Sequence, residues 1–237
     1  TTVLPEDTGE VLTFGDTGDA IAISGDSLNL NVLQDAGGNN LITSDGAGNL
    51  TINSGFGGAM NLLTTNTFTG TTTSNFTTLL DSTYDVYKFV YNAINPALLT
   101  GGYFVFNGSI DGGSNYNVNK TTSFFYARHD EADTTSTLAY NSTYDGNSIT
   151  GYQYLAPSIG GGADECAVGE LYLFTPSNTT YVKQYYATSN AILDNDFTYQ
   201  SIIGGFFSTA SAINAISFKM ETGNMDGEIK MYGISKS

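Results

Sequence analysis

This sequence contains few side chains of the kinds that carry out acid–base or nucleophilic chemistry. His129 is the only histidine and Cys166 the only cysteine in 237 residues. A nucleophile–histidine–acid triad would have to include His129, and a multi-histidine metal site, a cysteine-based zinc site or an internal disulfide lacks the residues it needs. His129 follows an aromatic strand within the charged segment 128–131, where we expect a solvated loop histidine. Cys166 is expected to be a small buried hydrophobic residue. No catalytic residue is predicted, and the protein is expected not to be an enzyme.

Carboxylates are the remaining candidates for catalysis, since a glycosidase needs only two of them. Three pairs lie close together in turn-like segments rich in glycine or asparagine: Asp164 with Glu165, Asp194 with Asp196, and Glu221 with Asp226. Aspartate is a favourable turn residue, so these contexts favour a structural role for the pairs. A polysaccharide-cleaving enzyme stays the third-ranked function.

Two segments are rich in side-chain oxygen. One runs from Asp111 to Asn117 and the other contains Asp194 and Asp196. Ca²⁺ takes its oxygen ligands from loops, so Asp111, Asp194 and Asp196 are the candidate metal ligands. Neither segment has the spacing of a helix–loop–helix calcium site. No other cofactor is expected.

Tyrosine is abundant, with 16 copies against no tryptophan. Its ring and hydroxyl suit stacking on sugar rings and contacts at protein interfaces, particularly beside asparagine and serine. The candidate binding residues are Tyr152, Tyr154, Tyr185 and Tyr186. The alternative is that these tyrosines line the rim of a core with their hydroxyls in water.

The formal net charge is −16, which disfavours binding to nucleic acid and to anionic membrane surfaces. No segment is long and apolar enough for membrane insertion, and no signal peptide is recognised. Charged residues nevertheless make up only 13% of the chain, so most of the exterior must consist of uncharged hydroxyl and amide groups. Such an exterior is typical of extracellular and virion-surface proteins and of carbohydrate-contacting surfaces, although solubility alone explains it equally well.

The composition favours an all-β fold, because aromatic and β-branched residues suit strands whereas Gly, Asn and Asp suit turns. Residues 79–237 form the main domain, expected to be an antiparallel, jelly-roll-like sandwich. Segments 131–137 and 155–162 are expected to be surface loops. The expected strands are 85–91, 102–106, 123–127, 151–155, 169–174, 180–187, 201–207, 215–220 and 227–232.

The N-terminal part has shorter strands, at 12–14, 20–23, 28–32, 41–43 and 50–53, which recur about every ten residues between Asp/Gly/Asn turns. The sequence therefore predicts a β-hairpin or solenoid-like stem over residues 1–60. It predicts a connecting segment over the Thr-rich residues 61–78. Strands this short cannot bury an apolar face alone. We expect the stem to self-associate as a homotrimer; packing back on its own chain is the alternative.

Several stretches carry a resemblance to known proteins. They are STYDVYKFV at 82–90, DGGSNYN at 111–117, INAISFKM at 213–220 and GNMDGEIKMYGI at 223–234. Together they resemble a domain common in structural proteins of marine bacteriophages, of the fibre or capsid-decoration type. The N-terminal segment is similar to shaft or attachment regions of phage fibres. The resemblance implies a trimeric virion protein exposed on head or tail, and it supplies no catalytic residue.

The sequence thus predicts a non-enzymatic bacteriophage structural protein at the virion surface. Its expected partners are its own copies, other virion proteins and host-surface polysaccharide. The alternative is a secreted, extracellular cellular protein that binds carbohydrate or forms filaments by strand exchange.

Overall fold

The computed structural model describes residues 32–34, 37–44, 47, 50–52, 59–97 and 101–235. These residues form strands, turns and bends without a helix, which confirms the all-β prediction. Accordingly, no helix in the described part of the chain could span a membrane. The chain divides into two compact units, Thr1–Gly57 and Gly58–Ser237.

The described part of the first unit is a three-stranded antiparallel sheet in the order β1-β2-β3. Its strands are β1 (Val32–Gln34), β2 (Asn40–Ser44) and β3 (Leu50–Ile52). No side chain of β1 or β2 is buried. The strands expected at 12–14 and 20–23, and most of the one expected at 28–32, lie outside the described residues.

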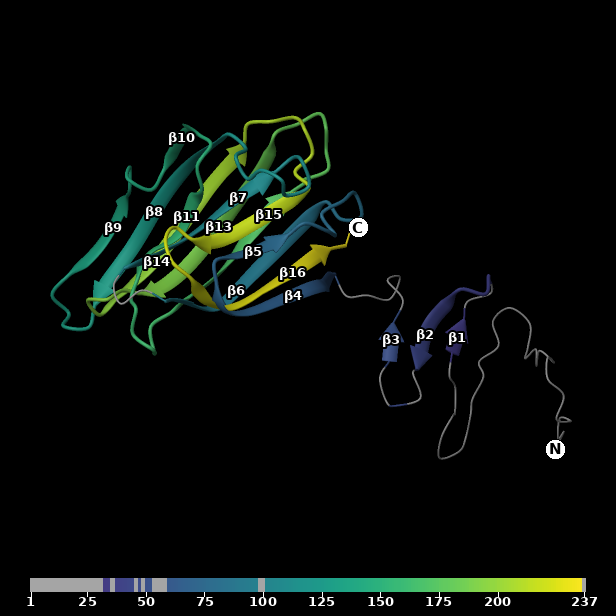
Figure 1. The fold of residues 1–237 in the computed structure, drawn as a ribbon, viewed down its shortest axis with the longest axis horizontal. Helices are drawn as coiled ribbons and strands as arrows, with labels where there is room; N and C mark the ends of the chain where they lie inside the picture. The colour runs from purple at the N-terminus through teal and green to yellow at the C-terminus, as the bar shows by residue number, and fades with distance from the viewer. Residues whose placement is uncertain are drawn as a thin grey trace, which may run out of the picture. The chain divides into compact units, whose positions relative to one another are not determined.

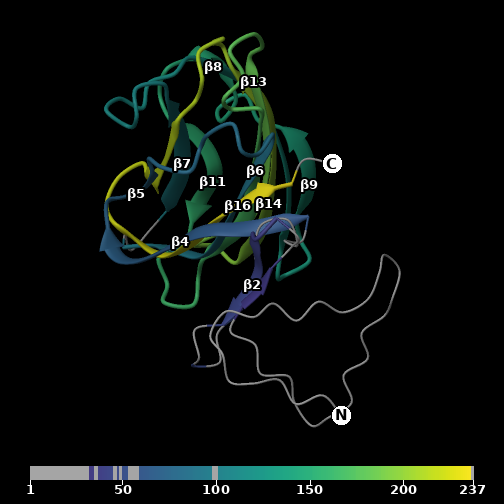
Figure 2. The same ribbon diagram turned by 90° about the vertical axis from the view of Figure 1, so that its right-hand side faces the viewer.

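The second unit contains two antiparallel sheets that face each other as a sandwich (Figures 1 and 2). One sheet has nine strands in the order β10-β8-β14-β13-β12-β6-β16-β4, with β9 paired to β8, and the other has four in the order β11-β7-β15-β5. The nine strands are β4 (Met60–Thr71), β6 (Val86–Pro96), β8 (Lys120–Asp130), β9 (Ser136–Tyr140), β10 (Gly146–Ile149), β12 (Ala167–Phe174), β13 (Lys183–Ile192), β14 (Phe197–Phe207) and β16 (Met225–Ile234). The four are β5 (Thr73–Phe76), β7 (Gly102–Ser109), β11 (Gln153–Ile159) and β15 (Ala215–Met220).

Residues 61–78 differ from the expected connecting segment. They contain most of β4, which pairs with β16 at the edge of the larger sheet, and all of β5, which pairs with β15 in the smaller one. Threonine is a good strand residue, but the partners of β4 and β5 lie far away along the chain. The segment therefore belongs to both layers of the sandwich.

The two expected loops also contain strand residues. β11 occupies most of segment 155–162, and its Leu155 is fully buried. Pro157 lies within β11, which is compatible with pairing because β11 is an edge strand. Segment 131–137 includes the start of β9.

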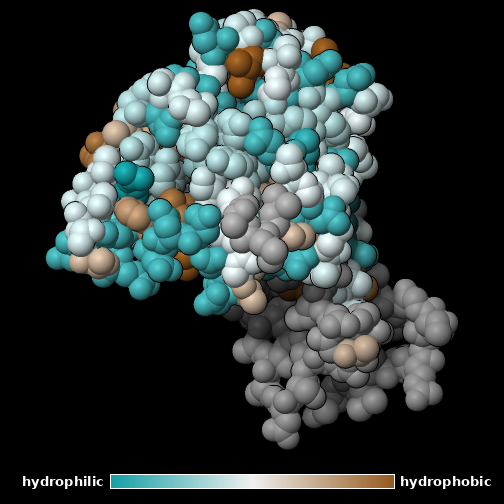
Figure 3. All heavy atoms as spheres, turned by 60° about the vertical axis from the view of Figure 1, so that its left-hand side comes forward, coloured by the Kyte–Doolittle hydropathy of each residue, from teal (hydrophilic) through white to brown (hydrophobic). Residues whose placement is uncertain are grey.

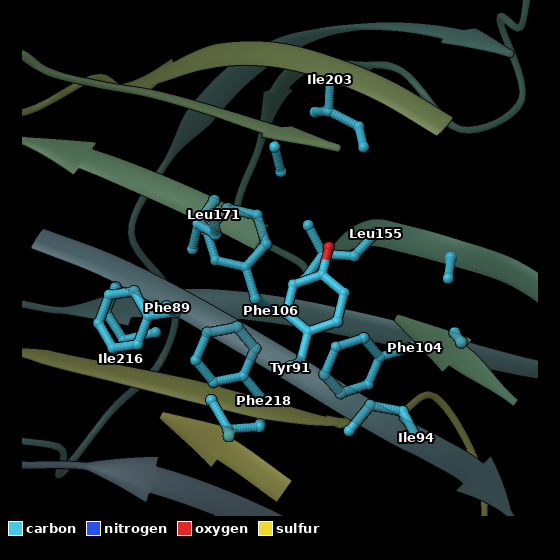
Figure 4. Close-up of a cluster of buried hydrophobic side chains, with 14 of the residues drawn as sticks. Phe89, Tyr91, Ile94, Phe104, Phe106, Leu155, Leu171, Ile203, Ile216 and Phe218 are labelled. Carbon is cyan, nitrogen blue, oxygen red and sulfur yellow. The ribbon is translucent and has the colours of Figure 1, made fainter. Parts of the chain in front are cut away.

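The core fills the space between the two sheets with aromatic side chains (Figure 4). Phe218 of β15 stacks on Phe104 of β7, with 5.8 Å between ring centroids. Phe218 also lies 5.4 Å from Phe89 of β6, across the sandwich. Tyr91, also on β6, is buried and donates its hydroxyl hydrogen to the Thr188 carbonyl oxygen at 3.1 Å. The alternating apolar residues of the strands thus meet in one continuous core.

Candidate binding face

The structure does not bring the four candidate tyrosines together. Tyr185 is buried in the core against Phe106 and Phe207, and Tyr186, the next residue, points to the opposite face of the sheet and is 44% exposed. The other two belong to the smaller sheet or its flank. The Tyr152 hydroxyl is 3.2 Å from Ser217 Oγ, and Tyr154 donates to Glu221 Oε1 at 2.9 Å.

The reactive residue types are equally dispersed. His129 lies on β8 rather than in a loop, and its Nε2 is 3.1 Å from Asp133 Oδ1 at an exposed position. Cys166 is half-buried.

Three carboxylates of the candidate pairs accept hydrogen bonds from different neighbours. Glu165 Oε2 accepts from the Gly162 amide at 2.5 Å, Glu221 accepts from Tyr154, and Asp226 Oδ1 accepts from the Gly70 amide at 2.6 Å. Glu221 and Asp226 thus accept hydrogen bonds from different residues and share no partner among these bonds.

The candidate calcium ligands lie at turns. Asp111 Oδ1 accepts hydrogen bonds from Ser109 Oγ at 2.6 Å and from the Asn115 amide at 2.9 Å, while its Oδ2 accepts from Asn115 Nδ2 at 2.7 Å. These hydrogen bonds, of which the one from Ser109 has the largest effect, lower the pKa of Asp111 to about 2. Asp194 and Asp196 lie in the turn between β13 and β14, where Asp196 has a positive φ of 61°. Within the described residues no three acidic, histidine or cysteine side chains gather as a metal site.

The outer face of the nine-stranded sheet, which points away from the core, carries several exposed apolar side chains. Residues at least 37% exposed on this face include Phe125, Val168, Tyr186, Ile192, Ile202 and Phe206. By contrast, the side of the molecule drawn in Figure 3 is mainly hydrophilic or near neutral, with scattered hydrophobic residues. A concentration of exposed apolar side chains on one face is a sign of binding.

An aromatic ladder, formed by Tyr172, Phe174 and Tyr186, lies on β12 and β13, two central strands of this outer face. Tyr172 of β12 and Tyr186 of β13 are directly opposite each other in the register, and their rings are 4.7 Å apart at 22°. The Phe174 ring is 5.6 Å from that of Tyr186. Because cross-strand side chains on one face are neighbours, the antiparallel register alone is sufficient to assemble the ladder.

Lys88 and Glu170 flank the ladder and form an ion pair. Lys88 Nζ is 2.6 Å from Glu170 Oε2 and 4.9 Å from the centroid of the Tyr172 ring. Burial lowers the pKa of Lys88, but the hydrogen bond and charge of Glu170 outweigh burial and the net pKa is raised. The ammonium therefore stays charged and its position over the ring is stabilised.

A hollow of about 270 Å³ lies next to the ladder, between β12, β13 and β14. Glu170, Thr188, Asn190 and Gln200 contribute polar side chains to it. In the register Glu170 is opposite Thr188, and Asn190 is opposite both Val168 and Gln200. Aromatic rings beside hydroxyl, amide and carboxylate groups can contact the apolar face of a sugar ring and hydrogen-bond its hydroxyls.

Of the residues in this site, the sequence identified only Tyr186. Tyr172 and Phe174 alternate along β12, a signal that could have placed them on one face, but their proximity to Tyr186 depends on the pairing of β12 with β13. No protein-family model, curated protein or solved structure matches the chain. The structure itself defines the class: an all-β protein with an antiparallel two-sheet sandwich.

Proposed function

We propose that this chain is a non-enzymatic structural protein of a bacteriophage particle, exposed at the virion surface as a trimeric fibre or capsid-decoration protein, and that it binds host-surface glycans. The glycan would contact the aromatic ladder and the adjacent hollow of the outer face. The observation that carries the proposal is the stacked Tyr172–Tyr186 pair beside Glu170, Thr188 and Asn190.

The finer architecture belongs to the same proposal. We assign the sandwich to a jelly-roll-like arrangement, since strands distant in sequence are neighbours in both sheets, as with β6 between β12 and β16. The first unit would be the stem, which associates with copies of itself and with other virion proteins. The absence of buried side chains in β1 and β2 supports this role, because such a sheet gains little from folding alone.

Replacing Tyr186 by alanine is expected to weaken glycan binding about tenfold, since an aromatic contact contributes up to about 1.5 kcal/mol beyond the apolar area it buries and tenfold corresponds to about 1.4 kcal/mol. Binding would be measured on an array of neutral and acidic oligosaccharides, followed by calorimetric titration with the best ligand.

Tyr181→Ala is the matched control, because Tyr181 is 69% exposed but lies outside the outer face, before β13. It should leave glycan affinity unchanged. Equal affinities of the Tyr186→Ala variant and the wild type, or no glycan binding by the wild type, would contradict the proposed binding face.

Removing residues 1–57 is expected to convert the trimer to a monomer while residues 58–237 keep their fold. The full chain should have about three times the 25.1 kDa mass of one copy in light scattering coupled to gel filtration. The described core residues all belong to the second unit, so its thermal unfolding should be unchanged. A shortened chain that remains trimeric would place assembly in the sandwich instead of the stem.

One observation favours a second candidate, a secreted cellular protein that forms filaments by strand exchange. β4 is a 12-residue edge strand whose Met60 and Leu62 are 48% and 54% exposed. A long edge with exposed apolar residues can accept a strand from another copy. Open filaments in electron micrographs, instead of closed threefold particles, would favour this candidate.

A further inference from the structure

A second site, the arginine pocket, lies between β8 and β14 of the larger sheet and β11 of the smaller one. In the register Tyr199 of β14 is directly opposite Arg128 of β8. Tyr126, two residues before Arg128, stacks on Tyr199 with 4.9 Å between ring centroids and 7° between planes. The pocket has a volume of about 170 Å³, and its polar lining groups are Tyr126, Arg128, Asn141, Tyr144, Ser158 and Tyr199.

Arg128 is the only arginine of the chain, and its guanidinium has no anionic partner within the described residues. Those residues form ion pairs only at Lys88, His129 and Lys230. Arg128 Nε is buried and has no hydrogen-bond acceptor. Its guanidinium carbon instead lies 5.2 Å from the centroid of the Phe197 ring and 6.0 Å from that of Tyr126.

The missing acceptor at Arg128 Nε distinguishes this side chain from the buried lysines of the described residues. Lys120 and Lys183, the two fully buried lysines, donate to oxygen atoms of neighbouring segments. A buried donor without an acceptor is unfavourable, and its presence in a pocket indicates that something outside the chain completes it.

The groups around Arg128 define the missing partner. A guanidinium matches the two oxygens of a carboxylate or phosphate in a planar, bidentate geometry. Stacked tyrosines provide an apolar wall, while Asn141 and Ser158 provide amide and hydroxyl groups suited to sugar hydroxyls. Burial raises the pKa of Tyr199 to about 12, so its phenol is neutral at physiological pH and does not repel an anion.

The charge of the surroundings favours a carboxylate over a more highly charged group. Asp130 and Glu131 follow Arg128 on the chain, and with Asp196 they line an adjacent acidic hollow. The whole chain carries −16 charges. A single arginine in this field suits a singly charged ligand better than a phosphate, which carries up to two charges.

We infer that the arginine pocket binds the carboxylate of an acidic sugar residue, a hexuronate, with Arg128 holding the carboxylate and the tyrosine pair contacting the sugar ring. This site is separate from the aromatic ladder and does not rest on the proposal made for the outer face. It gives the protein selectivity for uronate-containing polysaccharide.

Nitrogen–proton NMR of the full chain provides a direct test, because a single arginine gives a single side-chain Nε–H signal. Methyl β-D-glucuronide should shift that signal saturably at millimolar concentrations, and neutral methyl β-D-glucoside should not. Arg128→Lys keeps the positive charge but loses the bidentate geometry. Its affinity, followed through the backbone amides of Asn141 and Ser158, should fall at least about tenfold, as loss of a charged hydrogen bond predicts.

Two further variants separate this site from the outer face and from misfolding. Tyr186→Ala should leave the glucuronide shifts intact, whichever way it affects other glycans. Ser158→Ala keeps the arginine and should weaken glucuronide binding even if Arg128→Lys fails to fold. The inference is overturned if the glucoside, acetate or inorganic phosphate shifts the Nε–H signal as far as the glucuronide does, or if the glucuronide leaves it unmoved.

Discussion

Replacing Phe218 by alanine is expected to lower the free energy of unfolding of residues 58–237 by about 3–5 kcal/mol, the range for truncating a buried phenylalanine. Phe218 is fully buried and contacts rings from both sheets, Phe89 of the larger at 5.4 Å and Phe104 of the smaller at 5.8 Å. The cavity would lie between two hydrogen-bonded layers, which limits how far they can close around it. Since domains are stable by only about 5–15 kcal/mol, this loss would be a large share of the total.

Urea unfolding at 25 °C measures this effect, and Phe206→Ala is the matched control. Phe206 is 37% exposed on the outer face of β14, so its removal should cost less than about 1 kcal/mol. Equal losses for the two variants would show that Phe218 does not join the sheets as the core geometry indicates.

The stability of the wild type is expected to rise by about 2 kcal/mol between pH 7 and pH 9 because of Lys120. The Lys120 ammonium is fully buried and donates to Asn107 Oδ1 at 2.8 Å and to the Gly151 carbonyl at 2.5 Å, and none of the described carboxylates pairs with it. Burial lowers its pKa from 10.5 to about 7. Between these two values the unfolded chain binds more protons than the folded one, so raising the pH favours folding.

Lys120→Met isolates this contribution, because methionine has a similar length and no charge. Burial also lowers the pKa of Lys183, so some slope of the same sign should remain in the variant. The test is the difference between the two curves of unfolding free energy against pH, measured with urea. Identical slopes for wild type and variant would mean that Asn107 and the carbonyls keep Lys120 charged at its ordinary pKa.

The individual strands of the sandwich could be predicted well from the sequence. All nine strands expected after residue 79 overlap strands of the structure, because alternating apolar residues reflect burial on one side of a sheet. The missed strands have other patterns. β4 and β5 are rich in threonine, and β10 (GNSI) has little apolar character. β11 was expected to end at residue 155, but it continues through Pro157, which is compatible with pairing only at an edge.

The candidate sites were much less predictable. Tyr185 and Tyr186 are adjacent in sequence and equally aromatic, yet one is buried in the core and the other is exposed on the binding face. Alternation along a strand separates them but does not tell which points outward. Arg128 appeared only as part of a charged segment, because its tyrosine neighbour Tyr199 is supplied by a strand about seventy residues away.

The sequence by itself determined the all-β class, the scarcity of residues for acid–base chemistry and the acidic, weakly charged exterior, since these depend on composition and local alternation. Only the tertiary structure decided which strands pair and which faces are buried. That pairing places Tyr172 opposite Tyr186, and it places Tyr199 opposite Arg128. Strand pairing is long-range and depends on how the whole core packs, so no local pattern encodes it. For this protein, both proposed binding sites are products of sheet register.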